Sequence, residues 1–228
     1  MAIRQTCSVT PVYVWEVPVR IFHWVNAIAL VVLAVTGYLI GNPPALLTQQ
    51  EAYFGYWFGW VRFLHLASAY FFLFNWVFRI FWAFVGNSYA RWDNFIPMTK
   101  AQWDEIVCVI KVDLLQMVCG PIKSVGHNAL ASTIYLVLFV ASLFQILTGF
   151  ALLDPMSQSL IPNLFSWFGV FFESEMTLRF WHHATLWFFI LFVITHIYLV
   201  IYHDYVEARG VISSIVGGWK FIFNKHLE

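Results

Sequence analysis

Charged side chains are scarce in this sequence. Lys, Arg, Asp and Glu make up 11% of its 228 residues, whereas soluble domains carry about 25%. The formal net charge is zero, which gives no indication of nucleic acid as a partner. Hydrophobic residues make up 61% of the chain, so the composition indicates a protein that lies in lipid.

Cysteine motifs are absent as well. The three cysteines, Cys7, Cys108 and Cys119, form neither C-x-x-C nor C-x-x-C-H. This spacing excludes covalent c-type haem attachment and dithiol redox chemistry, and we interpret all three as ordinary apolar side chains. The first 20 residues also lack the apolar core of a secretory signal, so we expect no cleaved signal peptide.

The sequence does contain four long apolar segments. A helix needs about 20 apolar residues to cross a bilayer. Segments of this kind run over residues 21–40, 63–85, 130–153 and 182–202. A soluble core helix is rarely apolar on all sides for this length. We therefore predict an all-α integral membrane protein, in which residues 1–228 form a single domain built around a bundle of four transmembrane helices.

Basic residues are distributed unevenly between the two sides of this bundle. The side that holds both termini carries Arg4, Arg20, Arg91, Lys100, Lys111, Lys123, Arg209, Lys220 and Lys225. The opposite side carries only Arg62 and Arg179. The positive-inside rule therefore places both termini in the cytoplasm.

Two connections between the apolar segments have patterns of their own. Residues 99–119 place apolar side chains at helical spacing, which predicts an amphipathic helix on the cytoplasmic interface, with a solvated loop helix as the alternative. Residues 157–173 are very apolar for an external loop, so they either dip into the interface or form a docking surface. Thr36-Gly37-Tyr38 is echoed by Thr148-Gly149-Phe150, which is too short to indicate a repeat.

Four histidines lie within the apolar segments or at their ends: His23, His65, His182 and His196. Histidine is costly inside a membrane, so each is a candidate functional residue. His182 and His196 are 14 residues apart, which places both on one helix face about 21 Å from each other. In an antiparallel bundle, depth pairs His65 with His182 externally and His23 with His196 near the cytoplasm. His183 is rotated off the shared face and is interpreted as a polar neighbour.

Two histidines at each depth match the two axial positions of a haem iron. A zinc or copper site needs three or four ligands around one ion. We therefore predict two b-type haems in the core of the bundle, with His23, His65, His182 and His196 as the metal ligands. Because both axial positions are filled, the expected activity is electron transfer.

Further residues are expected near these cofactors. Gly37 lies at the depth of the outer haem and lets a macrocycle approach the backbone, with helix packing as the alternative. Arg79 is expected to pair with a propionate of the inner haem or to reach lipid headgroups. Arg20 has the same two interpretations, a haem propionate or a lipid phosphate. His127 is either a polar group at a helix start or part of a quinone pocket.

Several motifs across nearly the whole chain carry a family resemblance. They include Val17-Pro18-Val19-Arg20-Ile21-Phe22-His23-Trp24, Val35-Thr36-Gly37-Tyr38, Arg62-Phe63-x-His65, Arg79-Ile80-Phe81-Trp82-Ala83, Gly126-His127-Asn128, Leu147-Thr148-Gly149-Phe150-Ala151, Trp181-His182-His183 and His196-Ile197-Tyr198. Together they resemble the b-type cytochrome subunit of membrane-bound nickel–iron uptake hydrogenases. The axial haem ligands of that family match His23, His65, His182 and His196.

The resemblance implies a multi-pass protein of the bacterial cytoplasmic (inner) membrane with two haem b groups. It implies hydrogenase small and large subunits as periplasmic partners, and electron flow from the outer haem to the inner haem and on to menaquinone or ubiquinone. The chain has no hydrogen-splitting site, so it would be the electron-transfer subunit of a hydrogen:quinone oxidoreductase. Two alternatives stay open: the cytochrome b subunit of a formate dehydrogenase or related quinone-linked reductase, and a non-redox haem-binding membrane anchor.

Overall fold

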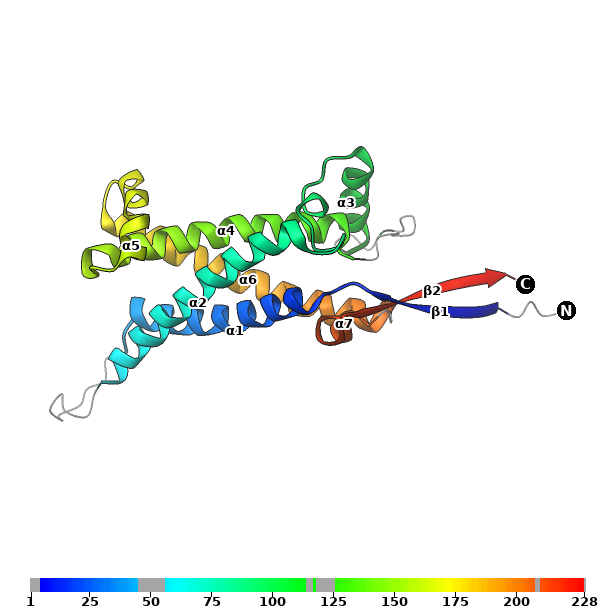
Figure 1. The fold of residues 1–228 in the computed structure, drawn as a ribbon, viewed down its shortest axis with the longest axis horizontal. Coiled ribbons are helices and arrows are strands. Elements are labelled where there is room, and N and C mark those ends of the chain that lie inside the picture. Colours follow the sequence, from blue (N-terminus) through cyan, green and yellow to red (C-terminus); the bar gives the residue numbers. More distant parts are fainter. Residues whose placement is uncertain (1–4, 45–55, 114–116, 118–125, 208–209, 228) are drawn as a thin grey trace. The chain divides into compact units, whose positions relative to one another are not determined.

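Four long helices dominate the structure. It is a computed structural model that describes residues 5–44, 56–113, 117, 126–207 and 210–227. They are α1 (Val17–Gly41), α2 (Trp57–Val85), α4 (Ala129–Leu153) and α6 (Glu175–Glu207), labelled in Figure 1. Each is long and apolar enough to cross a membrane. The predicted segments all lie inside these helices, so the prediction of four spans is confirmed.

Local chemistry explains where these helices begin and end. α1 ends at Gly41, ahead of Pro43 and Pro44, whose rings cannot continue a helix. The Asn128 side-chain oxygen accepts a 2.7 Å hydrogen bond from the backbone N–H of Ala131, which caps the start of α4. The Ser174 hydroxyl accepts the Thr177 N–H at 3.2 Å, so α6 begins at Glu175, before the predicted residue 182.

Shorter helices lie in the connections. They are α3 (Lys100–Asp113), α5 (Leu160–Phe165), α7 (Val211–Gly217) and 3-10 helices over Trp92–Asn94, Asp154–Met156 and Ser166–Phe171. α3 starts with a capping box, because the Thr99 N–H donates to the Gln102 side-chain oxygen while the Gln102 N–H donates to the Thr99 hydroxyl.

α3 covers the first part of the predicted interfacial helix, and residues 114–116 and 118–119 lie outside the described residues. Cys108 in this helix is disulfide-bonded, which corrects its interpretation as an ordinary apolar side chain. The apolar 157–173 segment forms α5 and the 3-10 helix after it. Its Leu160 is 82% exposed and its Val170 85% exposed, and both interpretations of this segment stay predictions.

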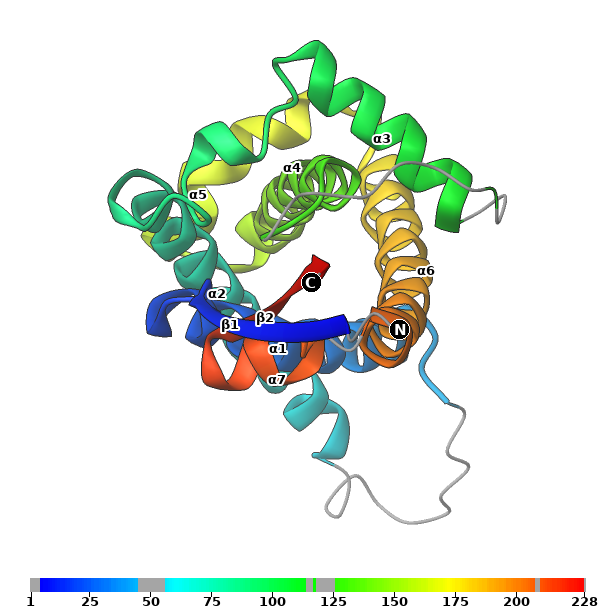
Figure 2. The same ribbon diagram turned by 90° about the vertical axis from the view of Figure 1, so that its right-hand side faces the viewer.

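Two strands depart from the prediction of an entirely helical protein. β1 (Gln5–Tyr13) and β2 (Trp219–Leu227) form an antiparallel pair, with Gln5 opposite Leu227 and Tyr13 opposite Trp219. Figure 2 shows this pair beside α7. Gly218 joins α7 to β2 with φ +91°, a backbone conformation that glycine adopts without steric cost. The partners come from opposite ends of the chain, so no local pattern indicates the pairing.

The chain forms two compact units, and each long helix contributes residues to both. The first unit consists of Met1–His23, Arg79–Leu138 and Thr195–Glu228, and the second of Trp24–Phe78 and Phe139–Ile194. The core of the first contains Val14, Trp15, Val19 and Ala90. The core of the second contains Ala29, Phe72, Leu73, Ile146 and Phe150. That residues 1–228 act as a single membrane domain stays a prediction.

Candidate cofactor sites

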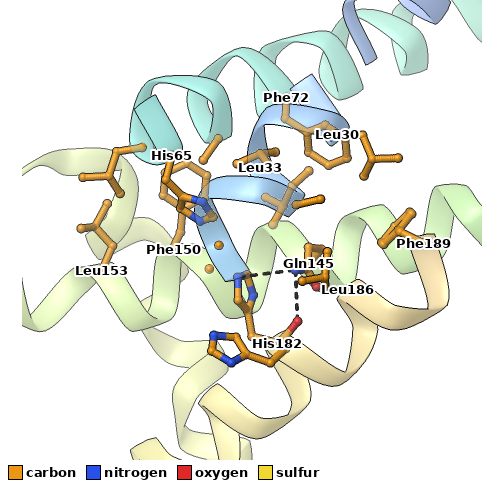
Figure 3. Close-up of a pocket in the computed structure, with 17 residues that line it drawn as sticks. Leu30, Leu33, His65, Phe72, Gln145, Phe150, Leu153, His182, Leu186 and Phe189 are labelled. Atoms are coloured by element: carbon orange, nitrogen blue, oxygen red, sulfur yellow. Dashed lines mark hydrogen bonds between the residues drawn. The ribbon is translucent and has the colours of Figure 1, made fainter. Parts of the chain in front are cut away.

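A cavity in the second unit is lined by two of the predicted ligands, His65 from α2 and His182 from α6 (Figure 3). It holds about 790 Å³ of space not filled by atoms, its open mouth included. The remaining wall is mainly apolar and includes Leu30, Leu33, Phe72, Phe150, Leu186 and Phe189.

A threonine of α1 orients the imidazole of His65. The Thr36 hydroxyl oxygen lies 2.6 Å from the carbonyl oxygen of Val32 and 3.0 Å from Nδ1 of His65. A hydroxyl has only one proton, and Thr36 donates it to the carbonyl. The hydroxyl oxygen can then accept a proton from Nδ1, and in that tautomer the lone pair on Nε2 of His65 is available to a metal.

The same arrangement recurs at His182. The Thr148 hydroxyl oxygen in α4 lies 2.9 Å from the Phe144 carbonyl oxygen and 2.8 Å from Nδ1 of His182. The Gln145 amide nitrogen lies 3.1 Å from the His182 carbonyl oxygen and 3.4 Å from its Nε2, as the dashed lines in Figure 3 mark. An amide N–H at Nε2 requires a lone pair there, so both neighbours favour a proton on Nδ1.

Glycines beside the two threonines give both rings room. A Cβ built at Gly37 would lie 3.1 Å from Cε1 of His65, and a Cβ built at Gly149 would lie 3.1 Å from Cε1 of His182. Even alanine would therefore press on the imidazole. Gly37 lines the cavity as the sequence predicts, and the space that it leaves is occupied by the His65 ring.

His183 was predicted to lie off the helix face that His182 and His196 share, and the structure places it differently. Its ring lines the same cavity and lies against Gly41 at the end of α1. Within the described ranges, no three His, Cys, Asp or Glu side chains are grouped to hold one metal ion. His65, His182 and His183 therefore do not form a site of the zinc type.

The other two predicted ligands meet in the first unit. The ring centroids of His23 from α1 and His196 from α6 are 6.4 Å apart, with an angle of 49° between the rings. His23 is half-buried and His196 is exposed. The structure thus brings His23 together with His196, and places His65 and His182 on one cavity, which are the pairings expected from depth.

Arg79 lies in an aromatic environment in the first unit. It is only 3% exposed, and its guanidinium carbon lies 5.1 Å from the ring centroid of Phe95 and 5.4 Å from that of Tyr135. Nη2 donates to the Ala90 carbonyl oxygen at 2.9 Å, whereas Nε and Nη1 have no hydrogen-bond partner. Among the described residues no carboxylate pairs with it. A buried cation in this state calls for an anion.

His127 is half-buried near this arginine. Its ring centroid lies 4.7 Å from that of Trp15 and 5.9 Å from that of Phe95, and its Nδ1 has no hydrogen-bond partner. Burial, helped by the positive charge of Lys220, lowers the pKa of His127 to about 3, so its imidazole is neutral at physiological pH. His127 precedes α4 rather than lying in it.

The Arg20 side chain forms a hydrogen bond within the protein. Its Nη1 donates to the carbonyl oxygen of Val216 in α7, and its buried Nε has no hydrogen-bond partner. The structure therefore gives Arg20 a link between α1 and α7. Its pairing with a propionate or a lipid phosphate stays a prediction.

Thr36 and Thr148 were missed by sequence reasoning as site residues. Their only local signal is the Thr-Gly-aromatic echo at 36–38 and 148–150, which by itself is short. The structure shows what the two copies share, because each threonine bonds one cavity histidine and each glycine makes room for the same ring.

Long apolar helices that present histidines from separate helices define a helical membrane protein of the metal- or cofactor-binding class. The family model of prokaryotic cytochrome b561 matches residues 14–218. A relative from Cupriavidus necator is 37% identical over 96% of this chain and 91% of its own length. One from Azotobacter vinelandii is 38% identical over 92% of this chain and 89% of its own length. One from Escherichia coli K12 is 34% identical over 95% of this chain and 94% of its own length.

The chain belongs to the prokaryotic cytochrome b561 family. The relatives from C. necator and A. vinelandii are each named "Probable Ni/Fe-hydrogenase B-type cytochrome subunit", and the E. coli relative "Probable Ni/Fe-hydrogenase 1 B-type cytochrome subunit". The resemblance drawn from the sequence motifs is thereby confirmed. Membership makes this chain a membrane cytochrome of the b type, whose cofactor is haem b.

Proposed function

We propose that this chain is a di-haem membrane cytochrome b that anchors a Ni/Fe hydrogenase on the periplasmic side and passes its electrons to quinone. The observation that carries the proposal is the division of four histidines into two pairs, one in each compact unit. Electrons would move from the outer haem to the inner haem and on to menaquinone or ubiquinone. Haem b supplies an iron that alternates between two oxidation states, and the chain supplies the ligands and the surroundings.

The cavity of the second unit fits a haem between His65 and His182. Threonine bonds at Nδ1 leave the Nε2 lone pair of His65 for an iron, and at His182 an iron would take the Nε2 lone pair from the Gln145 amide, which lies 3.4 Å away. Gly37 and Gly149 spare the space that the imidazoles occupy. The walls are mainly apolar, which suits the hydrophobic macrocycle of a haem.

The pair in the first unit also fits a shared iron. A bond of about 2 Å from a metal to each imidazole nitrogen puts two ring centroids about 6 Å apart. The observed separation of His23 and His196 is 6.4 Å. The free N–H groups of buried Arg79 suit a haem propionate, which would supply the counter-charge that the described residues lack.

A haem held by a histidine pair would have no free iron position for oxygen, so the chemistry that it would supply is electron transfer. α6 supplies one histidine to each pair, His182 and His196, so one helix connects the two sites. The chain would act as the electron-transfer subunit, while hydrogen splitting belongs to the hydrogenase small and large subunits. The names of the relatives favour this partner over a formate dehydrogenase.

The membrane placement is part of the proposal. The uneven distribution of Lys and Arg supports both termini in the cytoplasm, in a multi-pass protein of the bacterial inner membrane. α3 supports an interfacial position, because its exposed face carries Trp103, Val107 and Ile110 at helical spacing. The adjoining face of the helix buries Ile106 and Val109. An apolar exposed stripe of this kind is suited to the acyl boundary of the cytoplasmic leaflet.

A haem count tests the number of cofactors. The pyridine haemochrome assay on the purified full-length chain should give two haem b per polypeptide. One haem or none would overturn the di-haem proposal. The double variant His65→Ala/His182→Ala, which keeps the first-unit pair, should retain one haem and calibrates the assay.

Electron donors test the partner. In membranes that contain the chain and its hydrogenase, hydrogen should reduce the haems, and an added quinone should oxidise them again. A formate dehydrogenase subunit would respond to formate instead, and an inert haem-binding anchor would respond to neither. Membranes that lack the hydrogenase serve as the control, in which hydrogen should produce no reduction.

A further inference from the structure

We propose that Thr36 and Thr148 tune the haem held by His65 and His182, by accepting the Nδ1 proton of both axial imidazoles. This inference rests on the proposed function, since it requires a haem between these two histidines. It goes further by assigning the orientation of both ligands, and the potential of that haem, to two hydroxyl groups on helices that carry neither histidine.

The hydrogen bonds form two equivalent chains. In each, a threonine hydroxyl donates to the backbone carbonyl four residues earlier, at 2.6 Å for Thr36 and 2.9 Å for Thr148. The hydroxyl oxygen of Thr36 also lies 3.0 Å from Nδ1 of His65. The hydroxyl oxygen of Thr148 lies 2.8 Å from Nδ1 of His182. Since the hydroxyl proton is committed to the carbonyl, the imidazole must be the donor.

A second contact at His182 agrees with this direction. The Gln145 amide nitrogen approaches Nε2 of His182 at 3.4 Å, and an N–H can approach that atom only if it carries a lone pair. A lone pair on Nε2 puts the proton on Nδ1, in agreement with the Thr148 bond. The tautomer that results is the one an iron requires.

The glycine that follows each threonine restricts the same ring. Cε1 lies between the two ring nitrogens, and it is the atom that a Cβ at Gly37 or Gly149 would meet at 3.1 Å. The hydroxyl therefore holds Nδ1 while the adjacent backbone limits the rotation of the ring. The ligands come from α2 and α6, and both Thr-Gly pairs come from α1 and α4.

Such a bond changes the electronics of a ligand. Donation from Nδ1–H to an acceptor makes the imidazole a stronger electron donor through Nε2. A stronger donor favours the oxidised iron, which lowers the midpoint potential. Each hydroxyl is itself polarised by its bond to a carbonyl, so the two bonds of a chain reinforce each other. Loss of either threonine hydroxyl should consequently raise the midpoint potential of this haem.

The test compares valine with serine at both positions in the full-length protein. Thr36→Val and Thr148→Val keep the side-chain shape and remove the hydroxyl, whereas Thr36→Ser and Thr148→Ser keep the hydroxyl. Thr133→Val is the matched control, because Thr133 in α4 makes the same bond to the carbonyl four residues earlier, that of Ala129, at 2.8 Å. Optical redox titration gives the midpoint potentials of both haems, and EPR of the oxidised protein reports the orientation of the ligands.

Both valine variants should shift one haem to a more positive midpoint potential and move its EPR signal, with the second haem unchanged. The double variant should shift the same haem further, and serine should restore the wild-type values. Loss of that haem in a valine variant, with retention in the serine variant, also supports the proposal. Thr36→Ala and Thr148→Ala provide a second set if a valine variant fails to accumulate.

Two results would overturn the inference. One is a valine or alanine variant that retains both haems with unchanged potentials and EPR signals. The other is a serine variant that behaves like the valine variant, since the hydroxyl would then not be the cause. A wild-type chain with fewer than two haems is a separate failure, because it contradicts the proposed function before any threonine is changed.

Discussion

The imidazole rings of His23 and His196 are tilted by 49° with centroids 6.4 Å apart, whereas His65 and His182 line a cavity and each bonds a threonine hydroxyl. The two pairs therefore have different surroundings. The first-unit pair shares its unit with a buried arginine and its aromatic neighbours. The second pair has apolar walls and two Thr-Gly dipeptides. If each pair holds a haem as proposed, the different surroundings predict different midpoint potentials for the two.

The adjacent histidines of α6 should differ in their effect on haem content. His182→Ala should reduce the haem content from two per chain to one, because it removes an axial ligand. His183→Ala should keep both haems, although the ring of His183 lines the same cavity. The pyridine haemochrome assay measures both variants. Equal loss in the two would mean that the threonine bond at His182 does not mark the ligand.

Alanine at the two cavity glycines should disturb the cofactor of that cavity. Gly37→Ala and Gly149→Ala each place a methyl 3.1 Å from an imidazole Cε1, so the ring has to move by a few tenths of an ångström. Overpacking of this kind costs about 1–3 kcal/mol, and we expect partial loss of one haem with a shifted EPR signal for the remainder. Gly217→Ala is the control, since a Cβ there meets nothing within 4 Å.

Removal of the buried arginine should affect the other haem. Arg79→Leu leaves the proposed propionate without its counter-charge, and an uncompensated negative charge favours the oxidised iron. The midpoint potential of the inner haem should become more negative while that of the outer haem stays unchanged. Redox titration of Arg79→Leu beside Arg91→Leu, which removes an exposed arginine, provides the comparison. Unchanged potentials in Arg79→Leu would place the propionates elsewhere.

The burial of His127 predicts a pH-dependent stability. Its pKa is lowered to about 3 in the folded protein by burial, and a histidine in an unfolded chain titrates near 6.5. From about pH 6.5 down to about pH 3 only the unfolded state binds this proton. The free energy of unfolding should then fall with falling pH, by up to about 1.4 kcal/mol per pH unit from this group.

The variant His127→Phe isolates that contribution. Phenylalanine retains the ring contacts with Trp15, Phe95 and Tyr135 and lacks the titratable nitrogen. Denaturant unfolding in detergent at several pH values should give the variant a smaller slope below pH 6.5 than the wild type. Parallel slopes would show that His127 is solvated or protonated in the folded protein.

The four membrane helices could be predicted because hydropathy reports on each segment independently of the others. The histidine pairs followed from helical spacing combined with antiparallel order, and the structure brings the expected partners together. Thr36 and Thr148 could not be selected in the same way. Small polar residues are common in membrane helices, and only the contact with a second helix gives these hydroxyls a role.

Two further features of the structure had no signal in the sequence that could have predicted them. His183 reaches the cavity because the end of α1 at Gly41 leaves room for its ring, which is a property of the neighbouring helix and not of α6. The β1–β2 pair depends on register between segments at opposite ends of the chain. Spacing within one segment carries no information about such a partner, so an all-helical protein was the natural prediction.

The pairing of β1 with β2 has a consequence for biosynthesis. β1 is synthesised before the four long helices and β2 after them, so the two strands can pair only once all four helices have been made. Pairing of β1 with β2 would then mark the point at which all four long helices have been inserted. A polypeptide halted partway would keep an open strand edge, which is the kind of surface that quality-control proteases and chaperones recognise.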